Sequence, residues 1–150
     1  MKKAIEIAEF FLSMLDLSAG DTMSNLQLQK LLYFAQGFSL AINDKPIFEE
    51  DIEAWISGPV VPTVFFTYEK YRYSLPMPKR LNLKKFSKKE HDLLVEVYEK
   101  YGQFAAWRLK DLSNIDGGPW KRTYRIGENR VISHSLLKEY FLTQIVVEES

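Results

Sequence analysis

Residues 24–42 read SNLQLQKLLYFAQGFSLAI, and this stretch decides the fold that the sequence predicts. Ser24 and Gln27 have the spacing of a capping box, in which both side chains bond free amide groups at the start of a helix. Lys30 is the only charged residue of the predicted helix, which covers residues 25–42, and apolar side chains occupy more than one of its faces. A helix of this composition is mostly buried, and Gly37 within it indicates a close helix crossing.

The rest of the chain alternates amphipathic segments with turn signals. Apolar spacing predicts further helices over 3–15, 62–71, 88–101 and 105–112, and a last helix that Ser133 or Ser135 caps and that runs to 142. Short strands are expected at 52–56 and 81–83, a loop at 113–120 and a flexible tail at 143–150. The predicted fold class is therefore α+β, mainly α: a compact domain of five to seven helices with a small two- or three-stranded antiparallel sheet.

Composition sets the limits of function. The 150 residues contain 46% hydrophobic and 14% aromatic residues, enough for one core, so a single domain over 1–150 is expected. The absence of cysteine excludes disulfides and thiolate chemistry, and together with the lack of a signal peptide or membrane span it favours a cytoplasmic protein. The net charge is zero, but residues 1–60 hold four basic and nine acidic residues, and the rest hold sixteen and eleven.

Three motifs carry a family resemblance. They are LQKLLYFAQ at 28–36, AWISGPVVP at 54–62, and Leu112-Ser113 followed by Pro119-Trp120. In this order they resemble the Panacea (SocA-like, GepA-like) antitoxin family, whose pattern is close to LQKLLYYAQ, AWxxGPVVP and LSHxxxPW, over residues 7–140. Asn114 stands where the family usually has His, with an extra glycine after it, and an amide neither titrates near neutral pH nor binds metals as imidazole does.

The resemblance implies an antitoxin, associated with prophages or other mobile elements, that neutralises a toxin protein by contact. We expect a non-catalytic type II antitoxin that occludes its toxin through a face formed by Tyr33, Trp55 and the 58–62 turn. The candidate partner-binding residues are Gln29, Tyr33, Gln36, Trp55, Gly58, Pro59, Val60, Pro62, Asn114 and Trp120. Two rivals remain: an adaptor that delivers the toxin to a ClpXP-type protease, which one family member resembles, and an enzyme of unknown reaction.

Each candidate also has a purely structural interpretation. Trp55 and Trp120 are large enough to be core residues, with the turn between strand and helix serving only as a connection. Gln29 and Gln36 follow helical spacing and would then form an internal network that ties the helix to the Gly58-Pro59 loop.

Other charged and titratable residues give weaker signals. Residues 70–89 hold eight Lys or Arg and no acidic residue. We interpret this stretch as a solvated loop or a contact for an acidic toxin surface, and not as a nucleic-acid site, since no DNA-binding signature is present. His91 and His134 have no third ligand at a recognisable spacing, so no metal or cofactor is expected. The sequence leaves homo-oligomers open.

Overall fold

The computed structural model describes residues 1–71, 74–78 and 81–149, and for 146–149 only the backbone. Its elements within these residues follow one another along the chain as α1 (Ala4–Ser13), η1 (Leu17–Ala19), α2 (Asn25–Asn43), β1 (Glu53–Trp55), β2 (Gly58–Val60), α3 (Pro62–Tyr68), η2 (Leu83–Lys85), α4 (Lys88–Tyr101), α5 (Ala106–Ser113), α6 (Pro119–Thr123), β3 (Arg130–Val131) and α7 (His134–Glu149). The predicted mainly α, α+β fold class is confirmed. No helix in the described residues is both long and apolar enough to cross a membrane.

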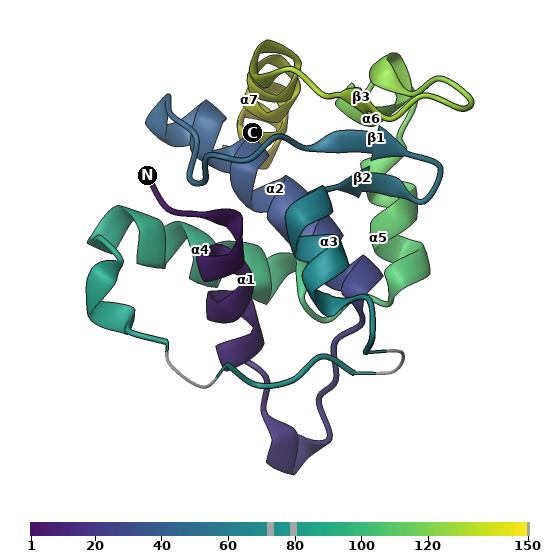
Figure 1. Cartoon of the computed structure of the whole chain (residues 1–150). Coiled ribbons are helices and arrows are strands. Elements are labelled where there is room, and N and C mark those ends of the chain that lie inside the picture. Colours follow the sequence, from purple (N-terminus) through teal and green to yellow (C-terminus); the bar gives the residue numbers. More distant parts are fainter. Residues whose placement is uncertain (72–73, 79–80, 150) are drawn as a thin grey trace.

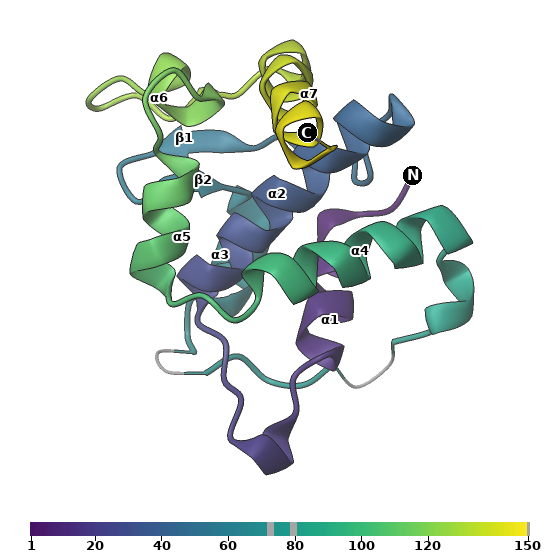
Figure 2. The same cartoon turned by 180° about the vertical axis from the view of Figure 1, so that it is seen from behind.

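Helix α2 lies at the centre of the molecule. Every residue from Leu28 to Leu40 is buried, and α1, α3, α4, α5 and α7 all contact the helix. Helices α1 and α3 lie on the side of α2 seen in Figure 1, and α4 and α5 on the side seen in Figure 2. Its start is the predicted capping box, because Gln27 N donates to Ser24 Oγ at 3.1 Å and Ser24 N to Gln27 Oε1 at 2.8 Å.

A close helix approach lies at Gly37, as predicted. A Cβ atom added at this position would overlap the ring of Phe141 on α7. That ring is itself enclosed by aromatic neighbours, with centroids 5.4 Å away at Tyr33, 4.8 Å at Phe38 and 5.1 Å at Tyr140. Helix α7 can therefore lie against α2 only because Gly37 has no side chain.

The three strands form a small antiparallel sheet in the order β2-β1-β3. Glu53 pairs with Val60 and Trp55 with Gly58 across the β1–β2 hairpin, while Glu53 also faces Val131 of β3. The predicted strand at 52–56 is confirmed in its central residues, but β2 lies within a stretch that the prolines mark as a turn. Strand β3 is only two exposed residues long and has no sequence signal.

Several helix ends differ from the prediction by one to three residues, and three segments differ in kind. The strand expected at 81–83 is wrong: Asn82 Oδ1 instead accepts a hydrogen bond of 3.0 Å from Lys84 N and starts the short helix η2. The expected loop at 113–120 ends early, since α6 begins at Pro119.

The third segment that differs from the prediction is the end of α7. Ser133 caps this helix, with Leu136 N donating to Ser133 Oγ at 3.2 Å, which is one of the two predicted caps. The helix continues past 142 to Glu149, so the backbone of 143–149 is helical where the sequence predicts a tail. The flexibility of 143–150 stays a prediction.

Gly37→Ala is expected to lower the free energy of unfolding by about 1–3 kcal/mol, because the added methyl group overpacks the contact with Phe141. In an open helix the same change would raise stability by up to about 1 kcal/mol, so the sign of the effect tests the close crossing. Chemical denaturation measures it. In a Phe141→Leu background, where space is available, the penalty should shrink; an equal loss in both backgrounds would contradict the contact.

Candidate functional site

The motif residues converge on the β1–β2 hairpin from three helices. Lys30 Nζ on α2 donates a hydrogen bond of 2.7 Å to the Ser57 carbonyl at the tip of the hairpin. Trp120 Nε1 on α6 donates one of 2.7 Å to the carbonyl of Trp55. The backbone of the hairpin is thus held on two sides by side chains from distant parts of the sequence.

Gln29 continues this network to the end of the hairpin. Its Oε1 accepts a hydrogen bond of 2.9 Å from Val61 N, and its Nε2 donates one of 2.9 Å to Asn25 Oδ1. Asn25 in turn donates 2.9 Å from Nδ2 to the Phe65 carbonyl in α3. One side of α2 therefore sets the position of both β2 and the helix that follows it, as the structural interpretation of Gln29 expects.

Gln36 serves a different segment. Its Oε1 accepts hydrogen bonds from Ile47 N at 2.8 Å and Phe48 N at 3.4 Å, and its Nε2 donates to the Phe48 carbonyl at 3.0 Å. The expectation that Gln36 ties the helix to the Gly58-Pro59 loop is corrected here. Gln36 lies further along α2 than Gln29, and at that point its side chain meets the segment before β1.

Gly58 is required where the hairpin meets Lys30. Its φ of 114° lies in the region that side chains disfavour, and an added Cβ would come within 3.1 Å of Lys30 Cε and 3.4 Å of Asn114 Oδ1. Asn114, at the end of α5, also lies 3.2 Å from the hydroxyl of Ser113. The position where the family pattern has His thus lies beside the buried lysine and the hairpin tip.

Lys30 is the only charged residue of α2, and it is buried, with 1% of its surface exposed. Burial and, to a smaller extent, the nearby positive charge of Lys110 together lower the pKa of its ammonium group to about 8. At neutral pH the group is charged and donates to the Ser57 carbonyl.

The candidate residues separate by exposure. Seven are buried: Gln29, Tyr33, Gln36, Gly58, Pro59, Val60 and Trp120. Tyr33 is 1% exposed and packs on Phe34 and Phe141, and burial raises the pKa of its hydroxyl well above the ordinary value. Of the ten candidates, only Trp55, Pro62 and Asn114 are partly exposed.

Around Trp55 the surface is apolar to a degree that the sequence reasoning missed. Ile56 is 78% exposed, Phe66 59% and Ile126 90%. The Trp55 ring lies 5.2 Å from that of Phe65 and 5.9 Å from that of Phe66, and it lines a hollow of about 270 Å³ with Ile56, Tyr124 and Ile126. We call this surface the hairpin face; its residues are Trp55, Ile56, Phe65, Phe66, Tyr124 and Ile126.

One weak sequence signal exists for the hairpin face. Ile126 stands next to Gly127 in a short polar turn between Arg125 and Glu128, where an apolar side chain has no core to enter. Chemically, the face offers apolar contact, and the network behind it offers hydrogen bonds and one ammonium group. Among the side chains described in 1–71, 74–78 and 81–145, no three His, Asp or Glu are grouped so that they could hold a metal ion.

Lys30→Met is expected to change how stability depends on pH. Because the folded chain loses the Lys30 proton near pH 8 and the unfolded chain near 10.5, the unfolded state binds more protons between these values, and stability rises with pH there. The free energy of unfolding of the wild type, minus that of Lys30→Met, should therefore be constant below pH 8 and increase by about 2 kcal/mol between pH 7 and 9.5.

The difference between the wild-type and Lys30→Met free energies cancels the contributions of the other titrating groups, including the tyrosines. Lys110→Gln is the matched control, because it removes the neighbouring charge and should move the rise to higher pH. A wild-type-minus-variant difference that stays flat from pH 7 to 9.5 would show that Lys30 is not charged in a desolvated site.

Comparison with known proteins agrees with the motifs. The sequence profile of the family described as "Antitoxin SocA-like, Panacea domain" matches residues 28–121, which include the buried network and the β1–β2 hairpin. Antitoxin SocA of Caulobacter vibrioides (strain NA1000 / CB15N) is 33% identical over 109 residues, which make up 65% of this chain and 58% of that protein. The match thus spans less than two thirds of the length of the curated relative.

No solved structure matches the chain. The family assignment rests on the profile, which covers more than half of the residues and contains all three motifs. The resemblance seen in the sequence is confirmed, and the chain belongs to the SocA-like Panacea domain family of antitoxins.

Proposed function

We propose that this chain is a non-catalytic antitoxin of a type II system, which neutralises a toxin protein in the cytoplasm by binding it directly. An antitoxin role is supported by the family and by the relative named antitoxin SocA. Direct binding is our inference from the surface of the molecule. The observation that carries it is the hairpin face, where large apolar side chains are exposed on a backbone held by buried hydrogen bonds.

The energetics of the hairpin face suit a binding surface. Transfer of one large aliphatic or aromatic side chain from water into a contact contributes about 1.5–3 kcal/mol, and Ile56, Phe66 and Ile126 are each more than half exposed. Tryptophan is among the most frequent binding anchors. Trp55 contacts Phe66 and also lines the hollow with Ile126, so it joins the two parts of the hairpin face. Little ordering is needed on binding, because Lys30 and Trp120 already hold the hairpin backbone.

The proposed toxin contact is therefore made by the exposed part of the candidate set. Trp55 and Pro62 remain proposed contact residues, Asn114 is a partly exposed neighbour, and the other five residues of the hairpin face join them. Five of the buried candidates act through the position of the hairpin: Gln29, Gly58, Pro59, Val60 and Trp120. Gln36 holds the segment before β1 instead. In this proposal Tyr33 supports the fold, and toxin does not touch it.

The first test uses the reading frame adjacent to the gene for this chain. Its product should arrest growth when expressed alone, and co-expression of this chain should restore growth. Ile56→Ser should weaken both rescue and co-purification of the two proteins, because it removes apolar contact area without touching the buried network. A tenfold loss of affinity, about 1.4 kcal/mol, is the expected order of magnitude.

Leu17→Ser is the matched control. Leu17 is 59% exposed in η1, at the end of the molecule away from the hairpin, so its substitution should leave rescue and binding unchanged. Equal effects of the two substitutions, or full binding by Ile56→Ser together with Trp55→Ala in folded protein, would contradict the hairpin face as the contact surface.

Protease-deficient cells separate occlusion of the toxin from its delivery to a protease. Occlusion requires only the complex, so rescue should persist when a ClpXP-type protease is deleted and toxin levels should stay constant. Growth assays and immunoblots of the toxin measure this. Loss of rescue with a rise in toxin level on deletion would support the adaptor function instead.

A further inference from the structure

A second hollow is lined by elements on the side of the molecule opposite the hairpin, and Figures 1 and 2 show where these elements lie. It has a volume of about 420 Å³ and lies between the N-terminal segment, the loop after α2, η2 and the start of α4. We call it the lysine groove, because lysines are its commonest lining residues: Lys2, Lys45, Lys84, Lys85 and Lys89. Hydrogen bonds from Lys2 N to the Ile47 carbonyl (3.4 Å) and from Glu49 N to the Lys2 carbonyl (3.1 Å) hold one wall.

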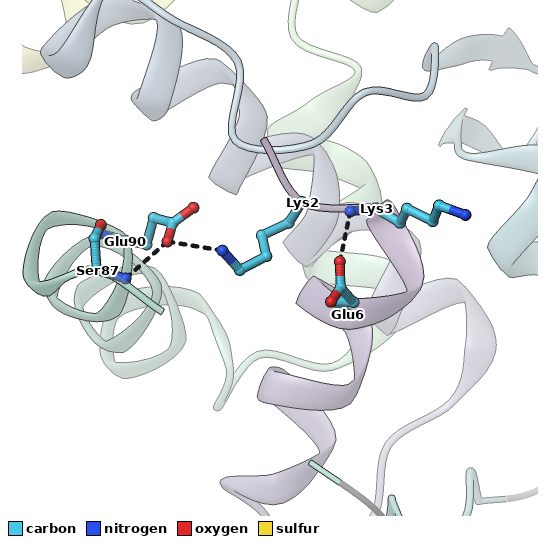
Figure 3. A network of polar contacts seen from close by, with 5 residues as sticks. All are labelled: Lys2, Lys3, Glu6, Ser87 and Glu90. Carbon is cyan, nitrogen blue, oxygen red and sulfur yellow. Dashed lines mark hydrogen bonds and ion pairs between the residues drawn. The ribbon is translucent and has the colours of Figure 1, made fainter. Parts of the chain in front are cut away.

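Glu90 is the one carboxylate among the described lining residues, and its charge is already offset. Its Oε1 accepts hydrogen bonds from Ser87 N at 2.8 Å and from Lys2 Nζ at 3.3 Å (Figure 3). Burial raises the pKa of Glu90, but these hydrogen bonds and the charge of Lys2 lower it more, so the carboxylate is ionised at neutral pH. Lys3 points away from this pair (Figure 3).

The remaining four lysines have no such partner. Among the described residues, no carboxylate lies within 4.0 Å of the ammonium groups of Lys45, Lys84, Lys85 and Lys89. Four like charges around one hollow repel one another, and the positive end of the α4 helix dipole adds to their potential. An anionic group entering the groove would relieve this repulsion.

The surroundings decide between the two common kinds of polyanion. Glu49, Glu50 and Asp51 follow directly after the wall formed by Ile47, and Asp92 and Glu96 follow along α4. A nucleic acid carries phosphates along its whole length, roughly one charge per 1.7 Å of duplex axis, and would run from the groove onto these acids. A short acidic peptide ends within the positive region, so the charge pattern favours it.

We propose that the lysine groove binds a short acidic peptide segment of a partner protein, at a surface separate from the hairpin face. This interaction goes beyond the proposed antitoxin activity and does not depend on it. Electrostatic attraction supplies most of the recognition, so binding should weaken steeply as salt is added.

Fluorescence anisotropy of a labelled hexaglutamate peptide with the full chain tests the groove. Lys84→Gln combined with Lys89→Gln should weaken binding about tenfold, since two close charge pairs are lost. Lys70→Gln combined with Lys121→Gln is the matched control: it removes the same charge from exposed positions outside the groove and should change affinity less than about twofold.

Glu90→Gln provides a test in the opposite direction. A glutamine in this position keeps the capping box with Ser87 while removing the carboxylate from the groove, so it should tighten binding of the peptide. Circular dichroism checks that all variants fold.

Three outcomes would overturn the proposal. They are absence of binding to hexaglutamate at low salt, equal losses in the groove and control variants, and tighter binding of a six-nucleotide oligothymidylate that depends on Lys84 and Lys89. The last result would assign the groove to nucleic acid.

Discussion

Helix α2 has no side in contact with water between Leu28 and Leu40, so every polar side chain on this stretch must find a partner inside the protein. A buried polar group without a partner costs about 1–3 kcal/mol. Four of these polar side chains bond backbone groups of the chain that follows the helix. Ser39 bonds the Lys45 carbonyl, Gln36 the amide of Ile47, Lys30 the carbonyl of Ser57 and Gln29 the amide of Val61. The order along the helix is the reverse of the order along the chain, so residues 45–61 run back along α2 and are held at four points.

This arrangement explains how the motifs relate to the surface. Lys30, Gly58 and Trp120 belong to the family pattern, and each takes part in the contacts that hold the hairpin in position. Ile56, by contrast, stands at a variable position of that pattern and is 78% exposed. The buried motif can therefore keep one frame while the exposed residues differ, which is how a single domain would suit different toxins.

The sequence predicts the elements whose causes are local and misses those whose causes are distant. Ser24 and Gln27 cap a helix whatever surrounds it, and Gly37 marks a crossing because only glycine admits Phe141. Strand β3 exists only because Val131 pairs with Glu53, which no local pattern reveals. The burial of Tyr33 was missed for a related reason. On a helix that neighbours surround on all sides, periodicity identifies a face but does not tell which face remains open.

The two proposed surfaces are connected by the same helix, and its packing decides how they can interact. The lysine groove begins at Lys45, whose carbonyl Ser39 holds near the end of α2, while Lys30 holds the hairpin in the first half of the helix. Coupling between two sites requires an element with two alternative arrangements. A buried helix with its polar groups paired and Gly37 against Phe141 has one arrangement that satisfies both ends. This geometry favours two partners bound at once and independently over a switch in which one displaces the other.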